Sequence, residues 1–136
     1  MRIPCRLDAR ATARLRKSLR RFGPALGWAS LILIVTSIPI PGTLATASPA
    51  GADKLVHATM YAVLAWLTAR GAGAPSARAA MVVFAAVAAF GAFDEWHQRF
   101  VPGRMSSRAD LVADVIGAGV GVLAFQSAHR RRESLS

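Results

Sequence analysis

The feature that most constrains this chain is a run of sequence without any charged residue, which covers residues 22–52. The run is longer than the about 20 mostly apolar residues that an α-helix needs to cross the hydrocarbon core of a bilayer. Further charge-free stretches cover residues 55–69, 79–93 and 115–128, and each reaches that length only when its polar ends are included. With 54% of its 136 residues hydrophobic, the composition is typical of an integral membrane protein. A soluble helical bundle is disfavoured, because its helices need a polar stripe along their length.

Turn-forming residues divide the chain into four predicted helices. Pro39, Pro41 and Gly42 end the first apolar run. Asp53 is predicted to be the N-cap of the second helix, since its side chain can accept a hydrogen bond from the first turn. The predicted helices cover residues 22–38, 53–70, 77–98 and 106 or 107 to 127. The predicted fold class is therefore an all-α membrane protein, with four transmembrane helices in a compact bundle and a basic N-terminal arm.

The first 21 residues form a basic arm with seven arginines and one lysine against a single aspartate. Apolar residues recur at every fourth position, so the arm is predicted to be either an amphipathic helix on an anionic membrane surface or a disordered basic tail. We expect three parts: the arm at 1–21, the four-helix transmembrane domain at 22–128 and a cytoplasmic tail at 129–136. A secretory signal that ends at Ala47 is an alternative, although the apolar run is longer than a typical signal core.

The basic residues are distributed unevenly between the two predicted membrane faces. The arm, the connection between the second and third helices and the C-terminal tail hold 13 of the 17 lysines and arginines. Cytoplasmic segments of membrane proteins carry the excess of positive charge, so both termini are predicted to be cytoplasmic. The cations flank apolar runs, so the lipid bilayer is the expected partner and no nucleic acid is expected. Trp28, Trp66 and Trp96 are interpreted as members of interfacial aromatic belts.

Polar and charged residues concentrate in the segment FDEWHQRFVPGRMSSRADLVAD, which covers residues 93–114. On the predicted topology, this segment and the start of the second helix lie at the same outer face of the membrane. Ionisable groups at membrane depth are costly and usually face the interior of a bundle, so these side chains are expected to converge. The predicted cluster, which either binds a ligand or braces the helices, consists of Asp53, Lys54, His57, Tyr61, Asp94, Glu95, His97, Gln98, Arg104, Ser106, Asp110 and Asp114.

Helical spacing favours a shared interior face. Asp110 and Asp114 lie on one side of the fourth helix together with Gly117 and Gly121. The GxxxG spacing of these two glycines allows another helix to approach closely. We expect one outward-facing pocket, formed by the second, third and fourth helices and surrounded by His57, Asp94, His97, Arg104, Asp110 and Asp114.

The polar motifs resemble those of the VanZ-like family of small bacterial membrane proteins. The motifs that carry the resemblance are DKLVH at 53–57, Tyr61, DEWHQRFVPGR at 94–104, Ser106–Ser107 and DLVAD at 110–114. The resemblance covers residues 25–127 and implies a multi-helix fold in the inner (cytoplasmic) membrane of a bacterium, with a role in the cell envelope. The family is named for a protein linked to teicoplanin resistance, and the resemblance implies no reaction. Arg108 is a local departure that alters the charge of the site.

Two interpretations of the cluster involve Arg104. In the first, the protein binds anionic lipids or cell-wall precursor head groups through Arg104 and the N-terminus of the fourth helix, beside Ser106, where free N–H groups favour anions. In the second, Arg104 pairs with Asp94 or Asp110 and braces the outer helix ends, because buried ions are normally paired. We expect an envelope-associated binding protein with a role in glycopeptide (teicoplanin) tolerance.

Other classes of function stay open but are less favoured. A membrane enzyme acting on a lipid-linked phosphate or sugar could use histidine–carboxylate pairs as acid and base, yet no Ser-His-Asp order or lipid-phosphatase box is present. A small drug exporter needs a carboxylate near the middle of a helix, and the first three predicted helices have none. With one cysteine and no HExxH motif, neither a metal site nor a cofactor is expected.

Overall fold

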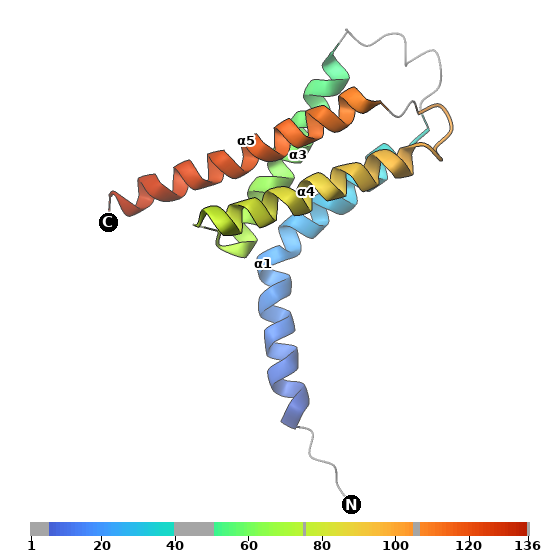
Figure 1. The fold of residues 1–136 in the computed structure, drawn as a ribbon. Helices are drawn as coiled ribbons and strands as arrows, with labels where there is room; N and C mark the ends of the chain where they lie inside the picture. The colour runs from blue at the N-terminus through green and yellow to red at the C-terminus, as the bar shows by residue number, and fades with distance from the viewer. Residues whose placement is uncertain (1–5, 40–50, 75, 105–106, 136) are drawn as a thin grey trace, which may run out of the picture.

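The computed structural model describes residues 6–39, 51–74, 76–104 and 107–135. Figure 1 shows the helices that these residues form, which are α1 (Arg6–Thr36), α3 (Ala52–Ala72), α4 (Ala77–Gln98) and α5 (Arg108–Glu133). No β-strand occurs within the described ranges. The predicted all-α class is therefore confirmed.

The two helices that follow serine begin where the sequence predicts. Helix α4 covers the predicted residues, and the Oγ atom of Ser76 accepts a hydrogen bond from the Ala79 N–H at 3.2 Å. Ser107 is the N-cap of α5, and its Oγ atom accepts from the Ala109 N–H, also at 3.2 Å. Each serine satisfies one of the N–H groups that the first turn of a helix leaves unpaired. Helix α5 continues past its predicted end at residue 127, as far as Glu133.

The prediction that Asp53 caps the second helix is wrong. Gly51 occupies the N-cap position of α3 with a φ of 89°, a left-handed conformation that glycine adopts without strain, and no side chain caps the helix. Asp53 lies inside the first turn instead. Its carboxylate still interacts favourably there with the positive end of the helix dipole.

Helix α1 differs most from its prediction, because it runs through Pro24. It was expected to begin at Phe22, whereas it also includes most of the basic arm. Pro24 cannot donate the N–H bond of a regular helix, and Figure 1 shows that α1 bends between its basic and apolar parts. The basic part extends away from the other helices, with Leu15 and Leu19 exposed. The helical alternative for the arm is confirmed over 6–21, while its contact with a membrane stays a prediction.

Helices α5 and α3 touch backbone to backbone at two glycines. A Cβ atom added to Gly117 would lie 2.1 Å from the carbonyl oxygen of Ala58, and one added to Gly121 would lie 2.1 Å from that of Ala62. Such distances leave no room for a side chain on either glycine. The close approach predicted from the GxxxG spacing is confirmed, and the partner helix is α3.

The apolar part of α1 packs against α3 and lies beside α4 (Figure 1). Ile32 is fully buried, and the indole N–H of Trp28 donates to the carbonyl oxygen of Met60 in α3 at 2.9 Å. Near the other end of α3, a Cβ atom added to Gly71 would lie 2.9 Å from the ring of Phe22. Trp28 is therefore partly buried with its N–H bonded inside the bundle, and its membership of an interfacial belt stays a prediction.

Two of the described helices, α4 and α5, are long and apolar enough to cross a membrane. The prediction of four such helices is corrected to two. In α3, charged residues in the first and last turns shorten the apolar part, and in α1 the apolar part begins only after Arg21. The outer faces of α4 and α5 carry exposed apolar side chains that suit a lipid environment, among them Met81, Val82, Ile116 and Leu123.

Candidate functional site

The polar residues of the predicted cluster lie towards one end of the bundle. This end, which we call the polar end, contains the C-termini of α1 and α4 and the N-termini of α3 and α5 (Figure 1). Burial of a polar group without a hydrogen bond costs free energy, so each buried group there needs a partner. The buried polar side chains of the described residues are Thr36, Asp94, Glu95, Gln98, Asp110 and Asp114.

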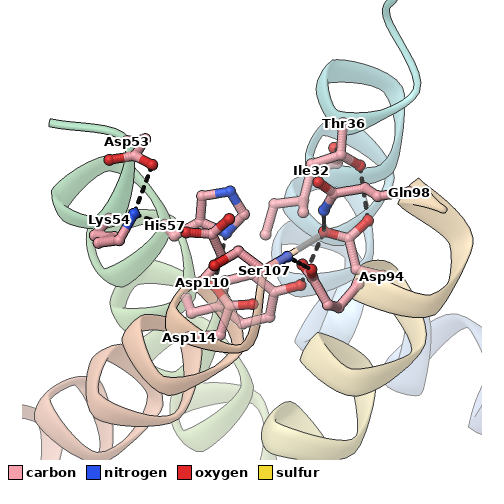
Figure 2. Close-up of polar contacts among 12 residues, drawn as sticks. Ile32, Thr36, Asp53, Lys54, His57, Asp94, Gln98, Ser107, Asp110 and Asp114 are labelled. Carbon is pink, nitrogen blue, oxygen red and sulfur yellow. Dashed lines mark hydrogen bonds and ion pairs between the residues drawn. The ribbon is translucent and has the colours of Figure 1, made fainter. Parts of the chain in front are cut away.

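Asp94 is fully buried and is held by neutral donors from three helices. Its Oδ1 atom accepts a hydrogen bond from the Thr36 hydroxyl of α1 at 2.7 Å. Its Oδ2 atom accepts from the Tyr61 hydroxyl of α3 at 3.2 Å and from the Gln98 amide of α4 at 3.1 Å. Figure 2 shows Thr36 and Gln98 pointing toward the carboxyl group. Asp94 therefore links α1, α3 and α4 without an ion pair to any described lysine or arginine.

Asp114 is fully buried on α5 and contacts His57 of α3. The Nδ1 atom of His57 lies 2.9 Å from the Oδ1 atom of Asp114 (Figure 2). The opposite side of Asp114 faces Gly91 of α4, where an added Cβ atom would lie 3.2 Å from the Asp114 Cβ atom. Glycine at that position lets α4 approach the carboxyl group. The Oδ2 atom of Asp114 has no hydrogen-bond partner among the described residues.

Lys54 connects the N-termini of α3 and α5. Its ammonium group lies 2.7 Å from the Oδ2 atom of Asp53 and 3.4 Å from the Oδ1 atom of Asp110. Figure 2 shows this group beside the His57–Asp114 pair. The side chains of Lys54 and Asp53 are 42% and 52% exposed, so their attraction is weakened by water. The contact with Asp110, whose side chain is only 11% exposed, is the one that joins two helices.

Glu95 of α4 contacts the N-terminus of α5. It is buried, and its Oε1 atom accepts a hydrogen bond from the backbone N–H of Ser107. The other carboxylate oxygen, Oε2, has no hydrogen-bond partner among the described residues. The helix N-terminus that was predicted to receive an anionic ligand is therefore occupied by a carboxylate of the chain itself.

Arg104 lies at the C-terminus of α1 and not beside the carboxylates. Its Nη2 atom donates to the carbonyl oxygen of Val35 at 2.7 Å, and its Nε atom donates to that of Ile38 at 3.3 Å. The last carbonyl groups of a helix lack partners within the helix and carry partial negative charge, which attracts a guanidinium group. The predicted pairing of Arg104 with Asp94 or Asp110 is therefore corrected: Arg104 is a C-terminal cap.

The expected pocket around six residues of the cluster stays a prediction, because none of the four pockets described for the structure is lined by these residues. The ring of His97 stacks on Phe93, with centroids 6.5 Å apart, and its Nδ1 atom is buried without a partner. Asp94, Asp110 and Asp114 pack inside the bundle and do not line a described pocket. Ser106 lies outside the described residues. Whether the cluster binds or braces stays a prediction.

An open pocket of about 410 Å³ lies instead between the C-terminus of α4 and the first turns of α5. Glu95 is the member of the predicted cluster that lines it, together with Arg99, Arg108 and Leu111. The pocket therefore combines a carboxylate that has one unpartnered oxygen with two guanidinium groups. Such a pocket can accept hydrogen bonds from a ligand and also pair with its anionic group.

Sequence reasoning missed Thr36 and the pocket residues Arg99 and Leu111. Thr36 lies one helical turn after the buried Ile32, so its position on the inner face of α1 could have been found by extending the helical spacing. Arg99 belongs to the charged stretch at 93–114 but was counted only as a flanking cation. No group of three or more His, Cys, Asp or Glu side chains within the described ranges is arranged to hold a metal ion.

Comparison with known proteins identifies the family of the chain. No curated protein and no solved structure matches the chain. The family model described as VanZ/LLP1 matches residues 10–129, which is most of the 136-residue chain and includes every residue of the polar end described above. The chain therefore belongs to the VanZ/LLP1 family.

Proposed function

We propose that this VanZ/LLP1 protein is a membrane-embedded binding protein of the bacterial cell envelope. Its polar end receives the head group of a lipid-linked cell-wall precursor, and this binding alters tolerance of glycopeptide antibiotics such as teicoplanin. The observation that carries the proposal is the pocket that Arg99 and Arg108 line together with the Glu95 carboxylate.

The chemistry of the pocket fits a head group that carries both phosphate and hydroxyl or amide groups. A guanidinium group matches the geometry of phosphate oxygens and can bond to two of them at once. The Glu95 carboxylate lines the pocket and can accept a hydrogen bond from a sugar hydroxyl or an amide N–H. The volume of about 410 Å³ lies within the range of roughly 300–1,000 Å³ that small-molecule pockets span.

The buried contacts of the polar end link the two helices that carry the pocket to the rest of the bundle. Asp94 ties three helices together, and the His57–Asp114 contact joins α3 to α5. Glu95 itself is oriented by Ser107, the residue that starts α5. Side chains that are locked by such contacts hold a binding group in a fixed geometry, which lowers the entropy lost when a ligand binds.

The orientation in the membrane follows from the charge distribution. We take α4 and α5 as a membrane-crossing hairpin, with α3 and the apolar part of α1 held in the bilayer by packing against it. The arm and the C-terminus of α5 carry the excess of positive charge, so they are expected on the cytoplasmic side of the membrane. The polar end then faces outward from the inner membrane, where lipid-linked cell-wall precursors are used.

An enzyme acting on such a lipid-linked substrate is the second candidate. The contact between His57 and Asp114 resembles an acid–base pair, in which a carboxylate orients an imidazole. The pair is enclosed, however, since the side chains of His57 and Asp114 are 12% and 0% exposed. Binding at the open pocket is therefore favoured over catalysis at the enclosed pair.

The proposal is tested in a teicoplanin-susceptible bacterium that expresses the protein. The wild type should raise the teicoplanin concentration that inhibits growth, and Arg108→Gln and Glu95→Gln should each remove the effect. Glutamine at position 95 keeps an oxygen that can accept from Ser107, so the fold should survive. Arg78→Gln, which removes one exposed arginine from the opposite end, is the matched control.

Membrane levels of all variants are compared by immunoblot. Tolerance that persists in both pocket variants would exclude the pocket from the function. Absence of any effect from the wild-type protein would exclude the glycopeptide role.

A further inference from the structure

A groove runs along the outside of the contact between α3 and α5. This apolar section of the groove is about 480 Å³ in volume, and almost all of its lining is apolar. The α3 side includes Ala62 and Trp66, and the α5 side includes Val120, Gly121 and Ala124. Gly121, which allows the close contact between the two helices, therefore also lines the groove beside it.

The groove leads to a second pocket near the C-termini of both helices. This pocket, about 280 Å³ in volume, is lined by Trp66, Arg70, Phe125, Ala128, His129 and Arg132. Trp66 lines both sections, and its ring meets that of Phe125 edge-on, with centroids 5.7 Å apart. Residues 62, 66 and 70 of α3 follow one another at a spacing of four, so they share one face of the helix. The two pockets therefore adjoin at Trp66, and we call them together the α3–α5 groove.

The charge of the second pocket is positive. Arg70 and Arg132 contribute guanidinium groups, and the nearby carboxylate of Glu133 lies 3.5 Å from the Nδ1 atom of His129. The pocket lies at the end of the bundle that also contains Arg78 and the basic part of α1, opposite the polar end (Figure 1). An apolar groove that ends in a basic pocket has the shape and charge of an amphiphile with an anionic head.

We propose that the α3–α5 groove binds an anionic phospholipid. Its phosphate pairs with Arg70 and Arg132, its glycerol region lies against Trp66 and Phe125, and one acyl chain follows the apolar section past Ala124. This site is separate from the outward pocket of the proposed function and serves the opposite leaflet. It does not depend on which ligand the polar end receives.

The expected preference follows from the two arginines. A basic residue at the surface of an anionic membrane contributes about 1 kcal/mol, so two arginines correspond to a preference of roughly 30-fold for an anionic over a zwitterionic phospholipid. Without both arginines, the lipids bound in the groove should have the same composition as the surrounding bilayer.

Trp66 provides the measurement, because it lines both sections of the groove. The full-length protein is reconstituted into phosphatidylcholine vesicles in which a minor fraction of the lipid is dibrominated, since bromine quenches tryptophan on contact. The part of the emission that disappears in Trp66→Phe is assigned to Trp66. Dibrominated phosphatidylglycerol should quench this part strongly, whereas the same amount of dibrominated phosphatidylcholine should quench only in proportion to its abundance.

Matched variants separate the pocket from general charge. Arg70→Gln with Arg132→Gln should abolish the preference, whereas Arg78→Gln with Arg131→Gln, which removes the same charge near the same end but outside the pocket, should retain it. Ala124→Leu, which fills the apolar section, should weaken quenching by both brominated lipids. Thermal unfolding in detergent confirms that each variant is folded.

Equal quenching by both brominated lipids in the wild type would overturn the proposal, and so would an unchanged preference in the Arg70/Arg132 double variant. A groove that holds a second copy of the chain would also overturn it. In that case Val120→Cys, in a Cys5→Ser background, would cross-link two chains efficiently in the same vesicles, and no lipid preference would be seen. None of these experiments measures teicoplanin tolerance. A negative result here therefore leaves the proposed function untouched, and a negative result there leaves the lipid site untouched.

Discussion

Replacing Gly117 by alanine should separate α5 from α3 and destabilise the protein. The added methyl group would lie 2.1 Å from the carbonyl oxygen of Ala58, and real Cβ contacts essentially never fall below 3.0 Å. The clash is with backbone, so no side-chain rotation can relieve it. The helices must therefore move apart by at least 0.9 Å at this point, the difference between these two distances.

The size of the effect follows from two opposing contributions. Overpacking a close contact costs about 1–3 kcal/mol. Replacing glycine by alanine inside a helix contributes about 0.5–1 kcal/mol in the other direction. We expect a net loss of up to about 2.5 kcal/mol in the free energy of unfolding, with a central value of about 1 kcal/mol. Because Ala58 adjoins His57 and Gly117 follows Asp114 by three residues, the same movement should also lengthen the His57–Asp114 contact.

Gly119→Ala is the matched control for Gly117→Ala. A Cβ atom at position 119 would meet the ring of Phe84 at 3.8 Å, which is an ordinary contact. This variant should be as stable as the wild type or slightly more stable. Unfolding is followed by circular dichroism of the detergent-solubilised proteins during heating. If Gly117→Ala unfolds at the same temperature as Gly119→Ala or higher, the backbone contact between α3 and α5 does not exist as described.

Three further predictions concern the polar end and the orientation of the chain. Thr36→Val removes the hydroxyl that donates to the buried Asp94 carboxyl group, so it should lower the stability by about 1.5–3 kcal/mol, whereas Thr59→Val, at an exposed position, should change it by less than about 0.5 kcal/mol. A similar unfolding temperature for the two variants would contradict the Thr36–Asp94 bond. Arg104→Gln should cost about 1 kcal/mol through loss of the α1 cap, and adding Asp110→Asn should restore nothing, because the two side chains are not paired. Recovery in that double variant would instead support the original bracing interpretation. With Cys5 replaced by serine, a membrane-impermeant thiol reagent applied to intact spheroplasts should label Ser48→Cys and not Ser134→Cys, and the reverse pattern would contradict the proposed orientation.

The sequence predicted those parts of the fold that depend on local signals. Ser76 and Ser107 mark helix starts because a serine oxygen can satisfy a free N–H of the first turn, and both serines do so. The spacing of Gly117 and Gly121 predicted a close helix contact because only the absence of a side chain allows one. These inferences need no knowledge of which helix is the neighbour.

The errors arose where the outcome depends on tertiary packing. Pro24 was expected to mark a helix start, yet a proline is tolerated inside a helix that bends, and the helix continues on both sides of it. Arg104 was assigned to the nearby carboxylates by charge alone, whereas the end of α1 offers it backbone carbonyl groups. The sequence shows that Asp94 and Asp114 belong to one polar region, but not that neutral donors would hold Asp94.

The most direct test of the central claim is the binding of a lipid-linked peptidoglycan precursor to the purified full-length protein. Native mass spectrometry from detergent micelles counts bound precursor on the wild type, Arg108→Gln, Glu95→Gln and the control Arg78→Gln. The wild type and the control should bind the precursor, and loss of a charged hydrogen bond of about 1.5–3 kcal/mol should weaken each pocket variant by at least about tenfold. Equal binding by all four proteins, or binding by none, would contradict the assignment of the polar end as a precursor-binding site.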